Sequence, residues 1–130
     1  MTEKSSTPTG FASLAMVTID CADPVVLAGF YSELLGWEIG HSQAEYAMIT
    51  NPLEGGAPIG FGQVAGYQPA PWPNPNGSKQ FHLDFYVDDL AKAATRAVEL
   101  GATFPEFQPG ETWRVLIDPA GHPFCLCIKS

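Results

Sequence analysis

Apolar and polar positions along the chain follow the same order of patterns twice. In the first copy, residues 14–20 alternate in the manner of a half-buried strand. The next apolar residues recur at helical spacing, at Leu27, Phe30 and Leu34. Asp23 suits the N-cap of this helix, Pro24 suits its first turn, and Gly36 ends it. The pattern predicts a strand followed by a helix.

The second copy repeats this plan. Residues 81–87 have the composition of a strand, Asp88 or Asp89 is the expected helix cap, and Gly101 is the expected stop. The apolar stripe of the second helix consists of Leu90, Ala94, Ala97 and Val98. A second strand–helix unit is therefore predicted.

The segments that follow each helix also match. Short strands are expected at residues 38–40 and around residues 103–107. Each copy then continues as strand, turn and strand, at residues 46–50 and 58–64 in the first copy and at 113–117 and 123–128 in the second. Asn-Pro or Asp-Pro with glycine supplies the turn chemistry in both. The chain is thus predicted to be α+β, with two βαβββ modules.

The repeat predicts a single domain of two modules, residues 11–66 and 80–130. Between them lies a linker, residues 67–79, with four prolines, which argue against a regular element. Residues 1–10 are polar and are expected to form a short disordered tail.

The composition of the chain argues against two classes of binding partner. The chain has 130 residues, a net charge of −8 and only six basic residues, so it is not expected to bind nucleic acid or an anionic membrane surface. No apolar run approaches a membrane span. The three cysteines, Cys21, Cys125 and Cys127, have neither metal-site nor disulfide spacing. We expect free thiols in a cytoplasmic protein.

Three segments in this order resemble the vicinal oxygen chelate superfamily, which includes glyoxalases, bleomycin-resistance proteins and extradiol dioxygenases. They are DPVVLAGFYSELLGWEI (residues 23–39), HLDFYVDDLAKAATRAVELGA (residues 82–102) and DPAGHPFCLC (residues 118–127). The sequence is most similar to the small bacterial glyoxalase-like domain proteins. The resemblance implies a curved mixed sheet around a cavity, with helices on its outer face, and a homodimer.

The resemblance also implies where a metal would be bound, by residues of the first and last strand of each module. These positions fall on Met16, His82, Cys125 and Gly60, or on Gly62 if the register slips. His82 is the only usual family ligand that survives, whereas a metal site needs three or four ligands. We therefore expect no metal and no other cofactor, with a weak divalent-metal site as the alternative.

Strand alternation indicates which side chains share the cavity face with His82. They are Met16, Thr18 and Asp20 from the first module, and Asp84, Tyr86 and Cys125 from the second. His82 and Asp84 are candidate catalytic residues, because a histidine beside a carboxylate can act as a general base. The alternative is that the two groups only satisfy each other's polar atoms.

Two further residues are candidate ligand contacts. Trp72, in the Pro-rich linker, is expected either to cover a planar ligand or to anchor the linker. Arg114 either reaches a ligand carboxylate or forms a salt bridge, and the salt bridge is favoured. Tyr46 and Trp113 occupy matching repeat positions and are expected in the core.

These expectations favour a protein that binds a small organic molecule in a metal-free cavity. The first alternative is a lyase, isomerase or dioxygenase-type enzyme that uses His82 with a non-standard metal site. The second is an interaction domain without a small ligand. A fold alone does not decide among these functions.

Overall fold

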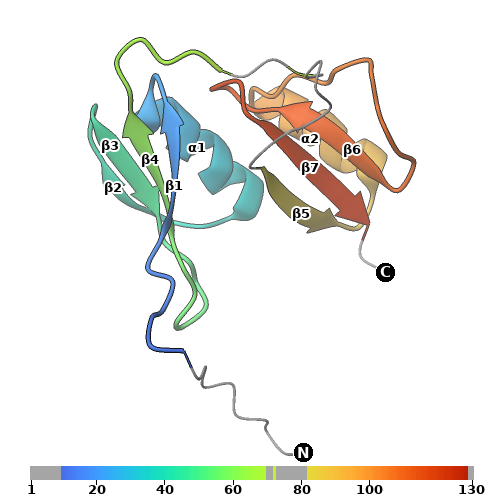
Figure 1. The fold of residues 1–130 in the computed structure, drawn as a ribbon. Helices are drawn as coiled ribbons and strands as arrows, with labels where there is room; N and C mark the ends of the chain where they lie inside the picture. The colour runs from blue at the N-terminus through green and yellow to red at the C-terminus, as the bar shows by residue number, and fades with distance from the viewer. Residues whose placement is uncertain (1–9, 70–71, 73–81, 129–130) are drawn as a thin grey trace, which may run out of the picture.

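The computed structural model describes residues 10–69, 72 and 82–128. In chain order its elements are β1 (Val17–Cys21), α1 (Pro24–Leu35), β2 (Ile39–Ser42), β3 (Tyr46–Ile49), β4 (Ile59–Gln63), β5 (Leu83–Val87), α2 (Leu90–Leu100), β6 (Trp113–Ile117) and β7 (Pro123–Ile128). The two modules lie side by side (Figure 1). The predicted tail and most of the predicted linker fall outside the described residues.

Each module has its own sheet. The strand order is β1-β4-β3-β2 in module one and β5-β7-β6 in module two. In both modules the first strand pairs in parallel with the last, and the last pairs antiparallel with the strand before it. This topology confirms the predicted α+β fold of two βαβββ modules.

Module two lacks the short strand predicted around residues 103–107. Thr103 forms only an isolated bridge to Ile117, and the Gln108 side chain takes the place of a neighbouring strand. The Gln108 amide nitrogen donates to the Val115 carbonyl at 2.9 Å, and its oxygen accepts from the Val115 N–H at 2.8 Å. The edge of β6 is thereby satisfied without another strand.

The predicted helix caps are confirmed. Asp23 accepts a hydrogen bond from the Val26 N–H, and Gly36 ends α1 with φ 74°. Of the two candidate caps for α2, Asp89 is the one used, since its side chain accepts from the Lys92 N–H. The first strand begins at Val17, later than the predicted residue 14, because β4, its only partner among the described strands, begins at Ile59.

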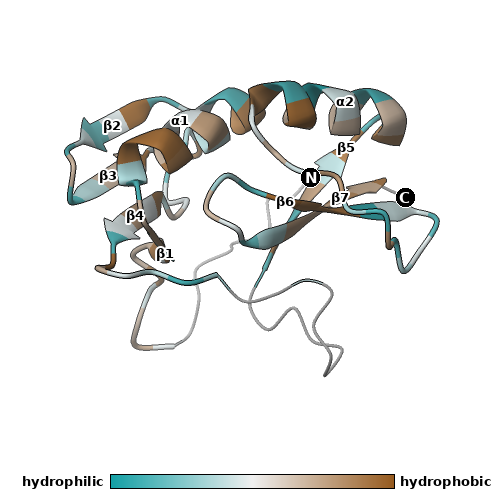
Figure 2. Ribbon diagram, turned by 90° about the horizontal axis from the view of Figure 1, so that it is seen from above, coloured by the Kyte–Doolittle hydropathy of each residue, from teal (hydrophilic) through white to brown (hydrophobic). Residues whose placement is uncertain are grey.

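One apolar core joins the modules. The rings of Phe30 and Tyr31, on α1, pack against Phe124 of β7 with centroids 5.7 Å and 6.1 Å apart. Tyr31 also stacks on Phe61 of β4. Figure 2 shows α1 and α2 next to each other, with the sheet of module two beneath α2. No helix of the described residues is long and apolar enough to cross a membrane.

Candidate functional site

The strand registers align the two modules residue by residue. Thr18 of β1 lies opposite Gly60 of β4, and Asp84 of β5 lies opposite Cys125 of β7. Gly60 is therefore the counterpart of Cys125, which excludes the alternative of Gly62. By the same registers, His82 is the counterpart of Met16.

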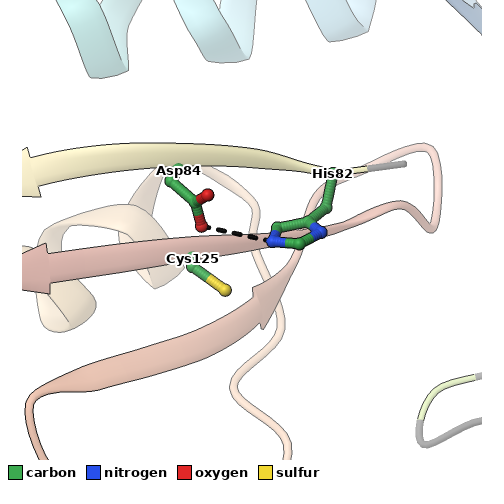
Figure 3. A group of neighbouring side chains, drawn as sticks. All are labelled: His82, Asp84 and Cys125. Atoms are coloured by element: carbon green, nitrogen blue, oxygen red, sulfur yellow. Dashed lines mark ion pairs between the residues drawn. The ribbon is translucent and has the colours of Figure 1, made fainter. Parts of the chain in front are cut away.

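Three side chains of module two with metal-binding atoms converge on one face of its sheet (Figure 3). His82 Nε2 lies 3.2 Å from Asp84 Oδ1, with 25% of the histidine side chain and 59% of the aspartate side chain exposed. One ligand atom from each of His82, Asp84 and Cys125 lies within 4.8 Å of the others. His82 Nδ1 is buried and has no hydrogen-bond partner among the described residues.

The three residues line a pocket of about 640 Å³. Its other side chains include Tyr86, Trp113 and Cys127, and all of its lining residues belong to module two. The prediction that Asp84, Tyr86 and Cys125 share a face with His82 is confirmed by this geometry. A polar pair beside aromatic rings on an open face can orient a small molecule by hydrogen bonds and stacking.

Trp113 corrects one sequence prediction. It was expected in the core, but it is only partly buried and lines the pocket. Trp113 lies directly opposite Cys127 in the antiparallel pairing of β6 with β7, and such a pair points to one face. The alternation of Cys125 and Cys127, combined with the predicted hairpin, was the signal that could have placed Trp113 in the site.

The counterpart positions in module one form a closed contact. The Tyr46 hydroxyl donates to Met16 Sδ at 3.0 Å. A Cβ atom at Gly60 would lie 2.7 Å from Tyr46 Oη and 2.8 Å from Met16 Sδ. Tyr46 and Met16 therefore fill the space that the missing Gly60 side chain leaves.

Met16, Thr18 and Asp20 do not line the module-two pocket. Thr18 and Asp20 are exposed on β1, and the Asp20 carbonyl contacts His122 Nε2 at 2.6 Å. The expected convergence of these residues with His82 does not occur within one chain among the described residues.

The other two predicted contacts also lie elsewhere. Arg114 faces away from the pocket, and Nη1 of its guanidinium donates to three backbone carbonyls. The prediction that Arg114 forms a salt bridge is wrong, because no carboxylate among the described residues pairs with its guanidinium. The Trp72 ring lies 6.2 Å from that of Phe107, a contact that agrees with an anchoring role.

The metal-ligand positions that the resemblance implies do not form a site in this chain, because module one offers only a thioether at Met16 and no side chain at Gly60. A different set does fit. His82, Asp84 and Cys125 supply nitrogen, oxygen and sulfur atoms, a combination suited to a borderline cation such as Zn²⁺ and unsuited to Mg²⁺. Sequence reasoning missed this set because Asp84 is not among the metal-ligand positions that the resemblance implies.

The Cys127 thiol of the pocket is not activated as a nucleophile. All three cysteines are free, as predicted. Burial raises the pKa of Cys127, and the nearby Asp84 carboxylate raises it further. A thiol with a raised pKa stays protonated and reacts slowly.

Comparison with known proteins places the chain in a family. Residues 16–127 match the model of the glyoxalase-like domain. A glyoxalase/bleomycin resistance protein/dioxygenase family enzyme from Burkholderia phytofirmans superimposes with a TM-score of 0.64 and 23% identity, covering 88% of this chain and 97% of that one. The fosfomycin resistance protein FosX from Mesorhizobium loti has a TM-score of 0.65 and 16% identity, covering 93% and 95%.

A glyoxalase-related enzyme from Fulvimarina pelagi gives a TM-score of 0.63 at 20% identity, covering 90% of this chain and 88% of that one. At such identities these structures establish the shared fold and no activity. No curated protein sequence gives a significant match. The family match covers most of the chain and agrees with its two-module topology. The chain belongs to the glyoxalase-like domain family of the vicinal oxygen chelate superfamily.

Proposed function

We propose that the protein binds a small organic molecule in the module-two pocket without a metal. The observation that carries this proposal is the His82–Asp84 pair at 3.2 Å, set in a pocket of about 640 Å³ beside Trp113 and Tyr86. The volume suits a drug-sized molecule. The rings offer stacking surface, and the partly exposed Asp84 carboxylate accepts hydrogen bonds.

The ligand we expect carries a ring and a cationic or hydrogen-bond-donating group. Asp84 is the charged group of the pocket lining, and the chain has a net charge of −8. Both favour a cation over an anion at this face. Trp113 and Tyr86 provide the aromatic surface on which such a cation or ring stacks.

We further propose that the site is completed in a homodimer. The pocket is lined by module two alone. Among the described strands, β1 and β5 each pair on one side only and so are edge strands. Pairing module one of one chain with module two of another would cover both edges and place Met16, Thr18 and Asp20 across from His82.

The test of ligand binding is a thermal-shift and tryptophan-fluorescence screen with cationic aromatic compounds. A ligand that binds the native state raises its apparent stability in a saturable manner. Asp84→Asn should weaken that shift, whereas Asp88→Asn should not, because Asp88 is an exposed acid that follows the same strand and lies outside the pocket. Equal loss of the shift in both variants would contradict recognition by Asp84.

The second candidate is a metal-dependent enzyme of the lyase or isomerase type, with His82 as its central residue. The observation that favours it is the His82, Asp84 and Cys125 set within 4.8 Å. These residues would hold the ion, and the open pocket would leave a coordination position for substrate. Bound to such a site, Zn²⁺ supplies Lewis-acid chemistry.

Elemental analysis of purified protein separates the two candidates. Stoichiometric zinc that is lost in Cys125→Ser and in His82→Ala would establish the metal-dependent candidate. Cys21→Ser is the matched control, since Cys21 is a buried free thiol outside this pocket. Ligand binding that persists in metal-free protein supports the first proposal.

A further inference from the structure

A second cavity lies on the other side of the module-two sheet. It measures about 680 Å³, between α2, β6 and the segment that follows α2. Arg114 lines it, and Arg114 alternates along β6 with Trp113 of the first pocket, so the two residues point to opposite faces. We call this cavity the α2 groove; its lining residues are chiefly Leu90, Ala94, Val98, Phe104, Glu99 and Arg114.

Most of the α2 groove is apolar and reachable from solvent. Val98 is 44% exposed and Phe104 is 47% exposed, although both are large hydrophobic residues. Exposed apolar side chains that gather in one concave place, rather than singly, indicate a binding surface. The groove therefore suits an apolar chain or ring.

Arg114 gives this apolar groove one fixed cation. Its Nη1 donates to the carbonyls of Trp113 at 2.9 Å, Gly110 at 3.1 Å and Glu111 at 3.3 Å. These bonds hold the guanidinium in place. Its Nε and Nη2 atoms have no hydrogen-bond partner among the described residues. The Nε–Nη2 edge of arginine is one that binds a carboxylate through two parallel hydrogen bonds.

The charges around the groove do not cancel this cation. Glu99 also lines the groove, but its carboxylate contacts Arg96 Nη1 at 3.4 Å. The net charge of −8 disfavours anions over most of the surface, so an anionic ligand would depend on Arg114.

We propose that the α2 groove binds an amphipathic monocarboxylate, an acid with a medium-length aliphatic chain or an aromatic ring. The carboxylate pairs with the free edge of Arg114, and the apolar part lies along Leu90, Val98 and Phe104. This site is separate from the proposed His82 site, and neither proposal requires the other.

The test uses decanoate below its micellar concentration, with binding measured by calorimetry and by chemical-shift changes in the full chain. We expect saturable binding that Arg114→Gln weakens at least about tenfold, a loss typical of a bidentate ion pair. Lys92→Gln is the matched control, because it removes one positive charge from α2 outside the groove lining and leaves the Arg96–Glu99 pair intact. Decanol should bind equally to the wild type and to Arg114→Gln.

A second variant guards against loss of folding at Arg114. Val98→Phe should block the groove while leaving Arg114 intact, and Val98 is exposed enough to tolerate a larger side chain. We expect decanoate binding to disappear in Val98→Phe and to persist in His82→Ala. Unchanged affinity in Val98→Phe, or chemical-shift changes centred on His82, would overturn the proposal.

Discussion

The Tyr31 hydroxyl donates a 2.6 Å hydrogen bond to Asp118 Oδ2, joining residues 87 positions apart. Tyr31 lies on α1 of module one, and Asp118 begins the β6–β7 turn of module two. The side chains are 1% and 3% exposed. Asp118 Oδ1 also accepts from the N–H groups of Ala120 and His122. This buried contact holds the two modules together and orders the turn that leads into β7.

Tyr31→Phe should lower the free energy of unfolding by about 1–3 kcal/mol, because it leaves a buried carboxylate without one of its donors. Urea unfolding measures this loss. A double-mutant cycle with Asp118→Ala isolates the contact from other effects of each change, because alanine offers the Tyr31 hydroxyl no acceptor. Strictly additive losses in the cycle would show that the hydrogen bond does not couple the modules.

Stability should also depend on pH through Asp118. Burial raises the pKa of this carboxyl above its usual value, and the hydrogen bonds from Tyr31 and His122 oppose the rise only in part. A raised folded-state pKa gives stability that is fully present below the unfolded pKa and is lost as pH rises through the folded pKa. The wild type should therefore lose stability relative to Asp118→Asn as the pH rises above about 4, the usual pKa of an aspartate. A difference that does not change with pH would contradict the raised pKa.

Gly60 and Gly62 offer a matched pair on β4. Gly60→Ala should destabilise the protein by about 1–3 kcal/mol, since its Cβ would force Tyr46 and Met16 apart. Gly62→Ala should cost less, because its Cβ meets only Thr18 Cγ2, at 3.8 Å. Thermal unfolding of both variants checks this order. Equal destabilisation of the two variants would show that position 60 needs glycine for its backbone flexibility and not because Tyr46 and Met16 occupy the space of a side chain.

The mass of the protein in solution tests the proposed homodimer directly. Sedimentation equilibrium should give twice the 13.9 kDa mass of the chain at micromolar concentration. If the measured mass equals that of one chain at every concentration, a second copy does not complete the module-two pocket.

Much of the fold could be predicted because its signals are local. The caps Asp23 and Asp89 and the stops Gly36 and Gly101 lie where helix chemistry requires them. The missing strand near Thr103 could not be foreseen, because the Gln108 side chain takes over the pairing of that edge. That exchange depends on a tertiary contact and not on hydrophobic periodicity.

The candidate site was predicted only in part, for a related reason. Period-two alternation correctly grouped Asp84 and Tyr86 with His82, because all three belong to one stretch of chain. The position of the Arg114 guanidinium depends on its hydrogen bonds to the loop carbonyls of Gly110 and Glu111. Strand alternation does not predict such contacts. Alternation also says nothing about whether module one faces module two within one chain.

The most direct test of the account is a ligand titration of protein stripped of metal with a chelator. Cationic aromatic compounds that bind should stabilise the wild type in a saturable manner without added zinc, and should do so less in His82→Ala. Stabilisation that appears only after zinc is restored, or that is the same in His82→Ala, would contradict metal-free recognition at the His82–Asp84 pair.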